Sequence, residues 1–198
     1  MESIYYLGSQ SPRRRTLLKL ILNDFNVIVP KFDEEVLENE SPINYVRRMS
    51  VGKSEAIAAQ FVDHFKPGSI FITADTIVYK GAKIFGKPKS REDGRAILRE
   101  LSDDVHKVIT DVTIAHCVEG GPSNPLVSRE SFSVSTDVYF RKLSDEIINS
   151  YLSTDEPWDK AGAYAVQGKG GCFIKKIDGS YHNVVGLPIA ELSERLGS

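Results

Sequence analysis

Apolar residues recur with two different spacings along the chain, and the change in spacing separates strands from helices. Short apolar runs at residues 3–7, 25–29 and 70–79 are typical of buried strands. Two longer segments, 108–114 and 132–140, alternate apolar and polar positions. The glycine- and proline-rich turn between these two segments predicts that they form an antiparallel pair.

Serine followed by proline, or by an acid three residues later, marks the expected helix starts. Serine is a favoured N-cap, and proline suits the first helical position. Such signals occur at Ser11-Pro12, at Ser41-Pro42 and at Ser90 with Asp93. The second signal predicts a long helix that ends near residue 61, and shorter helices are expected at 143–152 and 188–196. Helices and strands interleave, so the pattern predicts an α/β fold with a mixed sheet.

The composition excludes several classes of protein. The 198 residues are enough for one or two domains, and we expect a single domain over residues 1–198. The net charge of -2 argues against a binder that relies on a general basic field, so no stable nucleic-acid binding is expected. No apolar stretch approaches the length of a membrane span, and no signal peptide is evident at the start.

The two cysteines, Cys117 and Cys172, indicate the redox compartment. We expect free buried thiols, while a disulfide between them remains the alternative. Reduced thiols predict a cytoplasmic protein.

Lys53 lies on the apolar face of the long predicted helix. Val46, Met49, Lys53 and Ile57 fall within about 80° of one another at 3.6 residues per turn. A lysine in the middle of such a stripe either extends its ammonium to solvent or serves a buried anion.

Asp75 interrupts the apolar run at residues 70–79 and is followed by Thr76. An acid is unfavourable there, both by strand preference and by burial. It is either a hydrogen-bonded carboxylate at the end of the strand, or a metal ligand or general base, because ligands collect at strand ends in α/β proteins.

Residues 81–88 resemble a phosphate-binding P-loop but lack its last element. Pro88 stands where a serine or threonine would bind magnesium, and proline has neither the hydroxyl nor the backbone N–H. What remains is Lys87 on a constrained turn, able to reach a phosphate as a point charge.

Charged clusters at residues 13–15 and 33–35 allow both a functional and an ordinary interpretation. Three arginines at a helix start suit anion binding, and a solvated basic turn is the alternative. The acidic cluster could supply an oxygen ligand to a hard cation, or form an exposed loop. The four histidines share no metal-ligand spacing. They are His64, His106, His116 and His182.

Several short segments, in this order, resemble the Maf family of nucleoside-triphosphate pyrophosphatases over nearly the whole chain. They are Ser9-Gln10-Ser11-Pro12-Arg13-Arg14, Tyr45-Val46-Arg47-Arg48 with Lys53-Ser54, Ala74-Asp75-Thr76, Gly86-Lys87-Pro88, Leu101-Ser102 with His106 and Thr110, Asp159-Lys160-Ala161-Gly162-Ala163-Tyr164 with Gln167-Gly168, and Val184-Val185-Gly186-Leu187-Pro188. The resemblance implies an elongated mixed sheet flanked by helices with a central cleft, and a divalent cation, Mg²⁺ or Mn²⁺. It also implies hydrolysis of nucleotides to a monophosphate and pyrophosphate, and a homodimer.

The resemblance also implies roles for individual residues. Asp75 would accept a proton and bind the metal. Glu34 would be the second metal-site acid, although the neighbouring Glu35 leaves that alignment open. Lys53 and Lys87 would hold phosphates.

The phosphate end of the substrate would be lined by Ser9 and Arg14. Arg13, Thr76 and Gln167 match positions that sort the family's subgroups, and together they resemble the subgroup acting on dTTP and UTP. Modified pyrimidine nucleotides are a further possible substrate. The segment 119–125 reads as an insertion that lengthens a hairpin.

These residues predict metal-assisted attack of water on the α-phosphorus, with pyrophosphate as the leaving group. Two other functions stay open: a nucleotide-sensing regulatory binder acting on cell division, and a hydrolase that removes damaged purine nucleotides.

Overall fold

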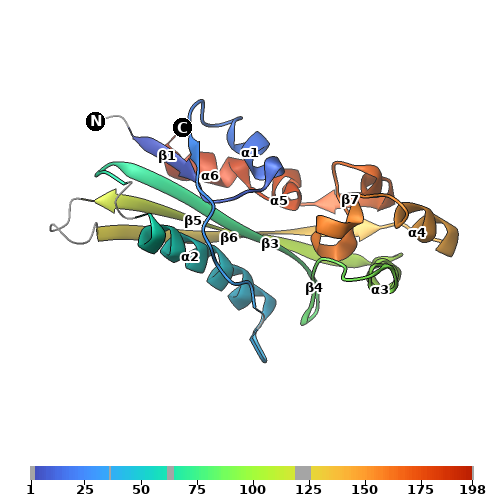
Figure 1. The fold of residues 1–198 in the computed structure, drawn as a ribbon. Coiled ribbons are helices and arrows are strands. Elements are labelled where there is room, and N and C mark those ends of the chain that lie inside the picture. Colours follow the sequence, from blue (N-terminus) through green and yellow to red (C-terminus); the bar gives the residue numbers. More distant parts are fainter. Residues whose placement is uncertain (1–2, 36, 62–64, 119–125, 198) are drawn as a thin grey trace. The chain divides into compact units, whose positions relative to one another are not determined.

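The computed structural model describes residues 3–35, 37–61, 65–118 and 126–197 (Figure 1). The helices and strands follow one another in the order β1 (Ile4–Leu7), α1 (Pro12–Leu18), β2 (Asn26–Val27), α2 (Pro42–Gln60), β3 (Ser69–Lys80), β4 (Lys83–Phe85), α3 (Arg91–Leu101), β5 (Val105–Val118), β6 (Leu126–Phe140), α4 (Asp145–Tyr151), β7 (Ile174–Asp178), α5 (Tyr181–Val185) and α6 (Ile189–Leu196). Three short 3-10 turns precede β7: η2 (Pro157–Asp159), η3 (Ala161–Ala163) and η4 (Lys169–Phe173).

The strands of the described residues form one seven-stranded sheet. Its order is β2-β1-β3-β5-β6-β7, and β4 pairs with β3. β1 is parallel to both β2 and β3, whereas β3–β4 and β6–β7 are antiparallel. The predicted α/β fold with a mixed sheet and flanking helices is therefore confirmed. Within the described residues, no helix combines the length and apolar character that crossing a membrane requires.

The chain divides into two compact units. Unit 1 comprises Met1–Asp75, Thr110–Ser133 and Gly186–Ser198, and unit 2 comprises Thr76–Ile109 and Val134–Val185. The single domain, the elongated outline and the central cleft expected from the sequence stay predictions.

Unit 1 is organised around α2, whose apolar stripe is buried as predicted. Val46, Met49 and Ile57 are all fully buried, and Ile57 packs with Phe65 and Phe71. The predicted N-cap of this helix also forms, because the Ser41 side chain accepts a hydrogen bond from a backbone N–H of the first turn. The same cap forms in α1 at Ser11. Local serine chemistry therefore fixes where both helices begin.

Unit 2 has an aromatic core. Phe140 contacts Tyr164 and Phe173 edge-to-face, and Tyr151 contacts Phe173 in the same way. α3 begins at the predicted cap, where the Ser90 side chain accepts from the Asp93 N–H. Phe85 of β4 and aliphatic residues of β3, α3 and α4 belong to the same cluster.

The structure differs from the sequence-based expectations in three places. The strand expected at 25–29 is only Asn26–Val27, which pairs with β1 at the edge of the sheet. The Asp93 carboxylate accepts from the Lys89 N–H instead of closing a capping box on Ser90. Both thiols are free, but only Cys117 is buried; the expectation of a buried Cys172 is wrong, because it lies exposed in η4. The insertion at 119–125 and His64 lie outside the described residues.

Candidate active site

Three charged side chains of unit 1 meet at the middle of β3. The Lys53 Nζ lies 2.7 Å from Asp75 Oδ1 and 2.5 Å from Glu34 Oε1. The Lys53 and Asp75 side chains are each 12% exposed, whereas that of Glu34 is 47% exposed. Lys53 therefore does not extend to solvent, and the sequence's alternative of a buried anionic partner is the one observed.

The acidic loop before α2 is held against that helix by close packing and by an ion pair. Phe32 lies so near Gly52 that a Cβ at position 52 would be 2.4 Å from its ring. Glycine inside a helix costs about 1 kcal/mol relative to alanine, and this close approach accounts for it here. Arg48 donates to both carboxylate oxygens of Glu40 and to the Glu35 carbonyl oxygen. These contacts place Glu34 beside Lys53.

Glu34 and Glu35 have different surroundings in the structure. The Glu34 carboxylate contacts Lys53, whereas Glu35 accepts a hydrogen bond from Arg48 through its backbone carbonyl oxygen. Two residues hold this loop: Arg48, which was named from the sequence only as part of a family segment, and Glu40, which was not named. The sequence does show basic residues on this helix and acidic residues in the loop before it, and these opposite charges could have predicted that the loop pairs with the helix.

Burial and charge act against each other at Asp75. Burial raises the pKa of the Asp75 carboxyl above its ordinary value, while Lys53 and Arg14 act in the opposite direction. A raised pKa makes a carboxylate a better proton acceptor. The arrangement thus combines a base with a nearby ammonium group.

Arg14 belongs to the same charged group of unit 1. Its Nε donates to the Gly186 carbonyl oxygen at 2.8 Å, and its Nη1 lies 3.4 Å from Ser9 Oγ. Burial lowers the pKa of Arg14, and the charge of Asp75 opposes that change. The structure therefore brings Ser9, Arg14, Lys53, Glu34 and Asp75 into one unit, and Arg13 lies half-buried on the first turn of α1.

The predicted site residues of unit 2 are less enclosed. Lys87 is exposed on its turn and has no hydrogen bond or ion pair among the described residues. The adjoining Gly86 carbonyl accepts from the Gly162 N–H at 3.1 Å, which ties this turn to η3. Gly162 has φ of 72° and would collide with Val78 if it carried a Cβ, so glycine is required there. Thr76 lies half-buried on β3, next to Asp75 in sequence.

Gln167 is exposed at the start of a turn that one carboxylate organises. Glu156 accepts hydrogen bonds from the Lys169 and Gly170 backbone N–H groups and from the Tyr151 hydroxyl. These bonds, together with the charge of Lys160, lower the pKa of Glu156 despite its partial burial. The turn is therefore fixed while the Gln167 amide remains available to a ligand.

The carboxylates of Asp75 and Glu34 suit a hard divalent cation. Mg²⁺ is usually bound by one or two carboxylates together with substrate phosphates, rather than by a complete cage of protein ligands. The described residues contain no group of three or more histidine, cysteine or acidic side chains placed to hold a metal ion. The oxygen donors that are present therefore fit a cation that arrives with a phosphorylated ligand.

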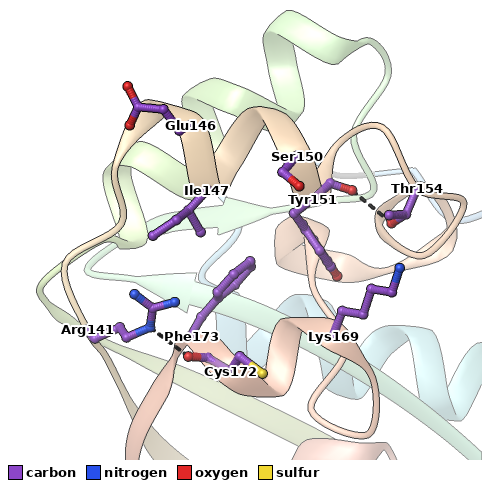
Figure 2. A pocket seen from close by; sticks show the side chains of 9 residues that line it. All are labelled: Arg141, Glu146, Ile147, Ser150, Tyr151, Thr154, Lys169, Cys172 and Phe173. Carbon is purple, nitrogen blue, oxygen red and sulfur yellow. Dashed lines mark hydrogen bonds between the residues drawn. The ribbon is translucent and has the colours of Figure 1, made fainter.

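A cavity of about 390 Å³ lies elsewhere in unit 2 (Figure 2). Figure 2 shows the phenyl ring of Phe173 between Arg141 and Tyr151, and the Arg141 Nε donating to the Cys172 carbonyl oxygen. None of the sequence-predicted site residues lines this cavity. Its lining consists of Arg141, Glu146, Ile147, Ser150, Tyr151, Thr154, Lys169, Cys172 and Phe173.

Comparison with solved structures supports the fold. The chain resembles the structure of the Staphylococcus aureus Ham1 protein with a TM-score of 0.54 and 17% sequence identity, over 98% of each chain. At this identity the likeness concerns the fold alone.

Comparison of sequences identifies the family. A protein of Alkaliphilus metalliredigens named dTTP/UTP pyrophosphatase is 42% identical over 190 residues, covering 96% of this chain and 93% of its own length. Proteins with the same name from Anaeromyxobacter dehalogenans and Carboxydothermus hydrogenoformans are 43% and 41% identical, each over 96% of this chain and over 91% and 96% of their own lengths. Residues 5–198 match the family described as Maf-like protein. The chain therefore belongs to the Maf-like protein family.

Proposed function

We propose that this protein is a pyrophosphatase that hydrolyses nucleoside triphosphates, preferably dTTP and UTP, to the monophosphate and pyrophosphate. Relatives more than 40% identical over nearly the whole chain carry the name dTTP/UTP pyrophosphatase. The observation that carries the proposal is the contact of Lys53 with both Asp75 and Glu34. This contact brings the proposed base Asp75, the ammonium group of Lys53 and the second acid Glu34 together within unit 1.

In the proposed reaction, water attacks the α-phosphorus of the nucleotide. The oxygen of water forms a bond to the α-phosphorus, the bond from that atom to the bridging oxygen breaks, and pyrophosphate leaves. Asp75 takes the proton from water, a role that its raised pKa favours. Lys53 and Arg14 stabilise the negative charge that spreads over the phosphoryl oxygens. Lys87 is proposed as a further phosphate ligand, and Ser9 as part of the phosphate end.

Asp75 and Glu34 are the residues proposed to hold Mg²⁺ or Mn²⁺. A bound divalent cation supplies positive charge to the phosphate oxygens and lowers the pKa of a coordinated water. The Lys53 ammonium group contacts both carboxylates.

Selection of the base is assigned to Arg13, Thr76 and Gln167, as the family resemblance implies. An exposed side-chain amide such as that of Gln167 can pair with the edge of a pyrimidine, and polar contacts of this kind discriminate strongly between substrates. A cytoplasmic location and a homodimer complete the proposal.

A panel of canonical and modified triphosphates, each with Mg²⁺ or Mn²⁺, tests the proposed function. Pyrophosphate and orthophosphate are scored separately for every nucleotide. Release of pyrophosphate, fastest from dTTP and UTP, is expected. Binding without release of either product under any cation would instead identify a regulatory binder, and preference for damaged purine nucleotides would identify a different hydrolase.

A further inference from the structure

A layer of polar side chains lies between α2 and the strands of unit 1, and the proposed chemistry does not use it. We call this group the polar layer; it consists of Ser50, Thr73, Asp111, Thr113 and Ser133. The first four have 0% relative exposure. Figure 1 shows α2 running along the strands to which this layer connects it.

The hydrogen bonds of the polar layer have one consistent direction. The Asp111 carboxylate accepts from the Ser50 hydroxyl and, at 2.5 Å, from the Ser133 hydroxyl. The Ser50 hydroxyl also lies 3.1 Å from the Arg47 carbonyl oxygen. Because this hydroxyl has a single proton and the bond to a carboxylate is the strongest of the three, we assign its proton to Asp111, so that Ser50 accepts from Thr113 at 2.8 Å. Thr113 then accepts from Ser131 at 2.9 Å. Arg47, largely exposed, lies 3.7 Å from Asp111.

The polar layer is adjacent to the proposed catalytic pair on both α2 and β3. Ser50 precedes Lys53 by three residues, so the two share a helix face. Thr73 precedes Asp75 by two residues, so the two share a sheet face. The Thr73 hydroxyl donates to the Ser50 carbonyl oxygen at 2.8 Å, and the Lys53 Nζ donates to Asp75 Oδ1 at 2.7 Å. Two polar contacts therefore join the same stretch of α2 to the same stretch of β3.

Stability alone does not explain a buried carboxylate here. Replacing buried polar or ionic groups with apolar residues of similar volume is often neutral or stabilising. Hydrophobic contacts are non-directional, and so they allow a helix to slide along a sheet. Hydrogen bonds are directional, and a fully satisfied buried network favours one arrangement of the elements that it joins.

We infer that the polar layer positions Lys53 against Asp75, by fixing the register of α2 on β3 and β5. The catalytic part of this inference rests on the proposed function, whereas the positional part does not. Ser50, Thr73 and Asp111 are thus positioning residues that act through Lys53.

Thr73→Val is the most direct test, because valine has the shape of threonine and lacks the hydroxyl. Its methyl group cannot approach the Ser50 carbonyl as closely as the hydroxyl does, so α2 is displaced. We expect kcat for pyrophosphate release to fall about tenfold, since a 1 Å misplacement can cost about a hundredfold. KM should stay near the wild-type value, and the urea midpoint of unfolding should fall only by the amount that corresponds to the loss of one buried hydrogen bond. Ser54→Ala is the matched control, because Ser54 is another fully buried serine of α2 whose hydroxyl contacts Arg129 instead.

A double-mutant cycle and a crystal structure separate positioning from a merely structural role. In a Lys53→Met background, Thr73→Val should cause no further loss of kcat. In the crystal structure of Thr73→Val, the Lys53 Nζ and Asp75 Oδ1 should be more than about 3.5 Å apart, beyond hydrogen-bond distance. Asp111→Asn, which replaces one acceptor with a donor, should show the same separation.

The inference is overturned if the contact and kcat of Thr73→Val both stay at wild-type values. It is equally overturned if kcat falls only in step with the urea midpoint, or if the two losses in the cycle are additive. Should the wild-type protein hydrolyse no nucleotide, the proposed function fails, and the crystallographic separation alone decides the positional claim.

Discussion

The two units bury titratable side chains in opposite states. In unit 1, Lys53 and Asp75 form an ion pair with little exposure. In unit 2, the His106 Nε2 lies 2.8 Å from the Tyr164 hydroxyl, and the imidazole packs edge-to-face against Phe140. Burial lowers the pKa of His106 to about 4, with a smaller contribution from Lys80 in the same direction. The histidine is therefore neutral near pH 7.

The difference supports the proposal that the charged pair of unit 1 serves catalysis, whereas the neutral pair of unit 2 serves packing. Removing charged groups from water costs free energy. In unit 1 the opposite charges of Lys53 and Asp75 offset part of that cost, and both groups also suit a phosphorylated substrate. The neutral pair of unit 2 avoids that cost, although the His106 Nδ1 finds no hydrogen-bond partner among the described residues. The predictions below test whether the two buried pairs have these separate roles.

The largest effect is expected from Asp75→Asn. The amide keeps the size of the side chain but cannot accept a proton, so kcat should fall by about two to four orders of magnitude. Circular dichroism and the urea midpoint should show that the fold persists. Asp137→Asn, which breaks the partly exposed pair with Lys107, is the control and should retain turnover. Full turnover of Asp75→Asn with excess magnesium would remove Asp75 from its role.

Removal of divalent cations should also nearly abolish activity. Chelation should lower the rate at least about a hundredfold, because the cation is expected to contribute several kcal/mol of charge stabilisation. Addition of Mg²⁺ or Mn²⁺ should restore the rate. Glu34→Gln should increase the cation concentration needed for half-maximal rate, whereas Glu35→Gln should not. Equal shifts in the two variants would contradict the assignment of Glu34.

A smaller effect, on stability, is expected from the histidine of unit 2. The unfolded chain binds a proton near the ordinary histidine pKa of 6.5, whereas the folded protein does so only near pH 4. Stability is therefore lost as the pH falls between these values. The loss should be about 2 kcal/mol between pH 7 and pH 5.

Urea unfolding of the wild type and of His106→Gln at both pH values measures this contribution. The difference in unfolding free energy between the two proteins should shrink by that amount at pH 5. An unchanged difference would show that His106 is not held neutral, and the contrast between the two units would be lost.

The smallest effect is expected at the exposed amide of unit 2. Gln167→Ala should lower the preference for dTTP over GTP, measured as the ratio of kcat/KM values, by about tenfold. The rate with dTTP itself should change less, because the paired charges of unit 1 are untouched. An unchanged preference among dTTP, UTP and GTP would exclude Gln167 as the residue that recognises the base.

Local signals in the sequence predicted the framework of the fold. Ser11 and Ser41 cap the helices that they were expected to start, and the stripe around Lys53 is buried. These features depend on residues only a few positions apart. The strand at 25–29 was overestimated because Asn26–Val27 lies at the edge of the sheet, where pairing with β1 alone determines its length.

Contacts between distant segments could not be predicted in the same way. The pairing of Lys53 with Glu34 depends on the packing of Phe32 against Gly52, which no local pattern encodes. Asp111 is 61 positions from Ser50, and its role in the polar layer is visible only in three dimensions. The sequence did place an acid inside a strand and a lysine on an apolar helix face, and the structure joins the two.

Hydrolysis of dTTP in ¹⁸O-labelled water tests the central claim most directly. Attack on the α-phosphorus places the label in the monophosphate, and mass spectrometry of the two products shows where it is. We expect labelled dTMP and unlabelled pyrophosphate, at a rate that Asp75→Asn lowers by at least about a hundredfold. Label in pyrophosphate or in orthophosphate would contradict the account.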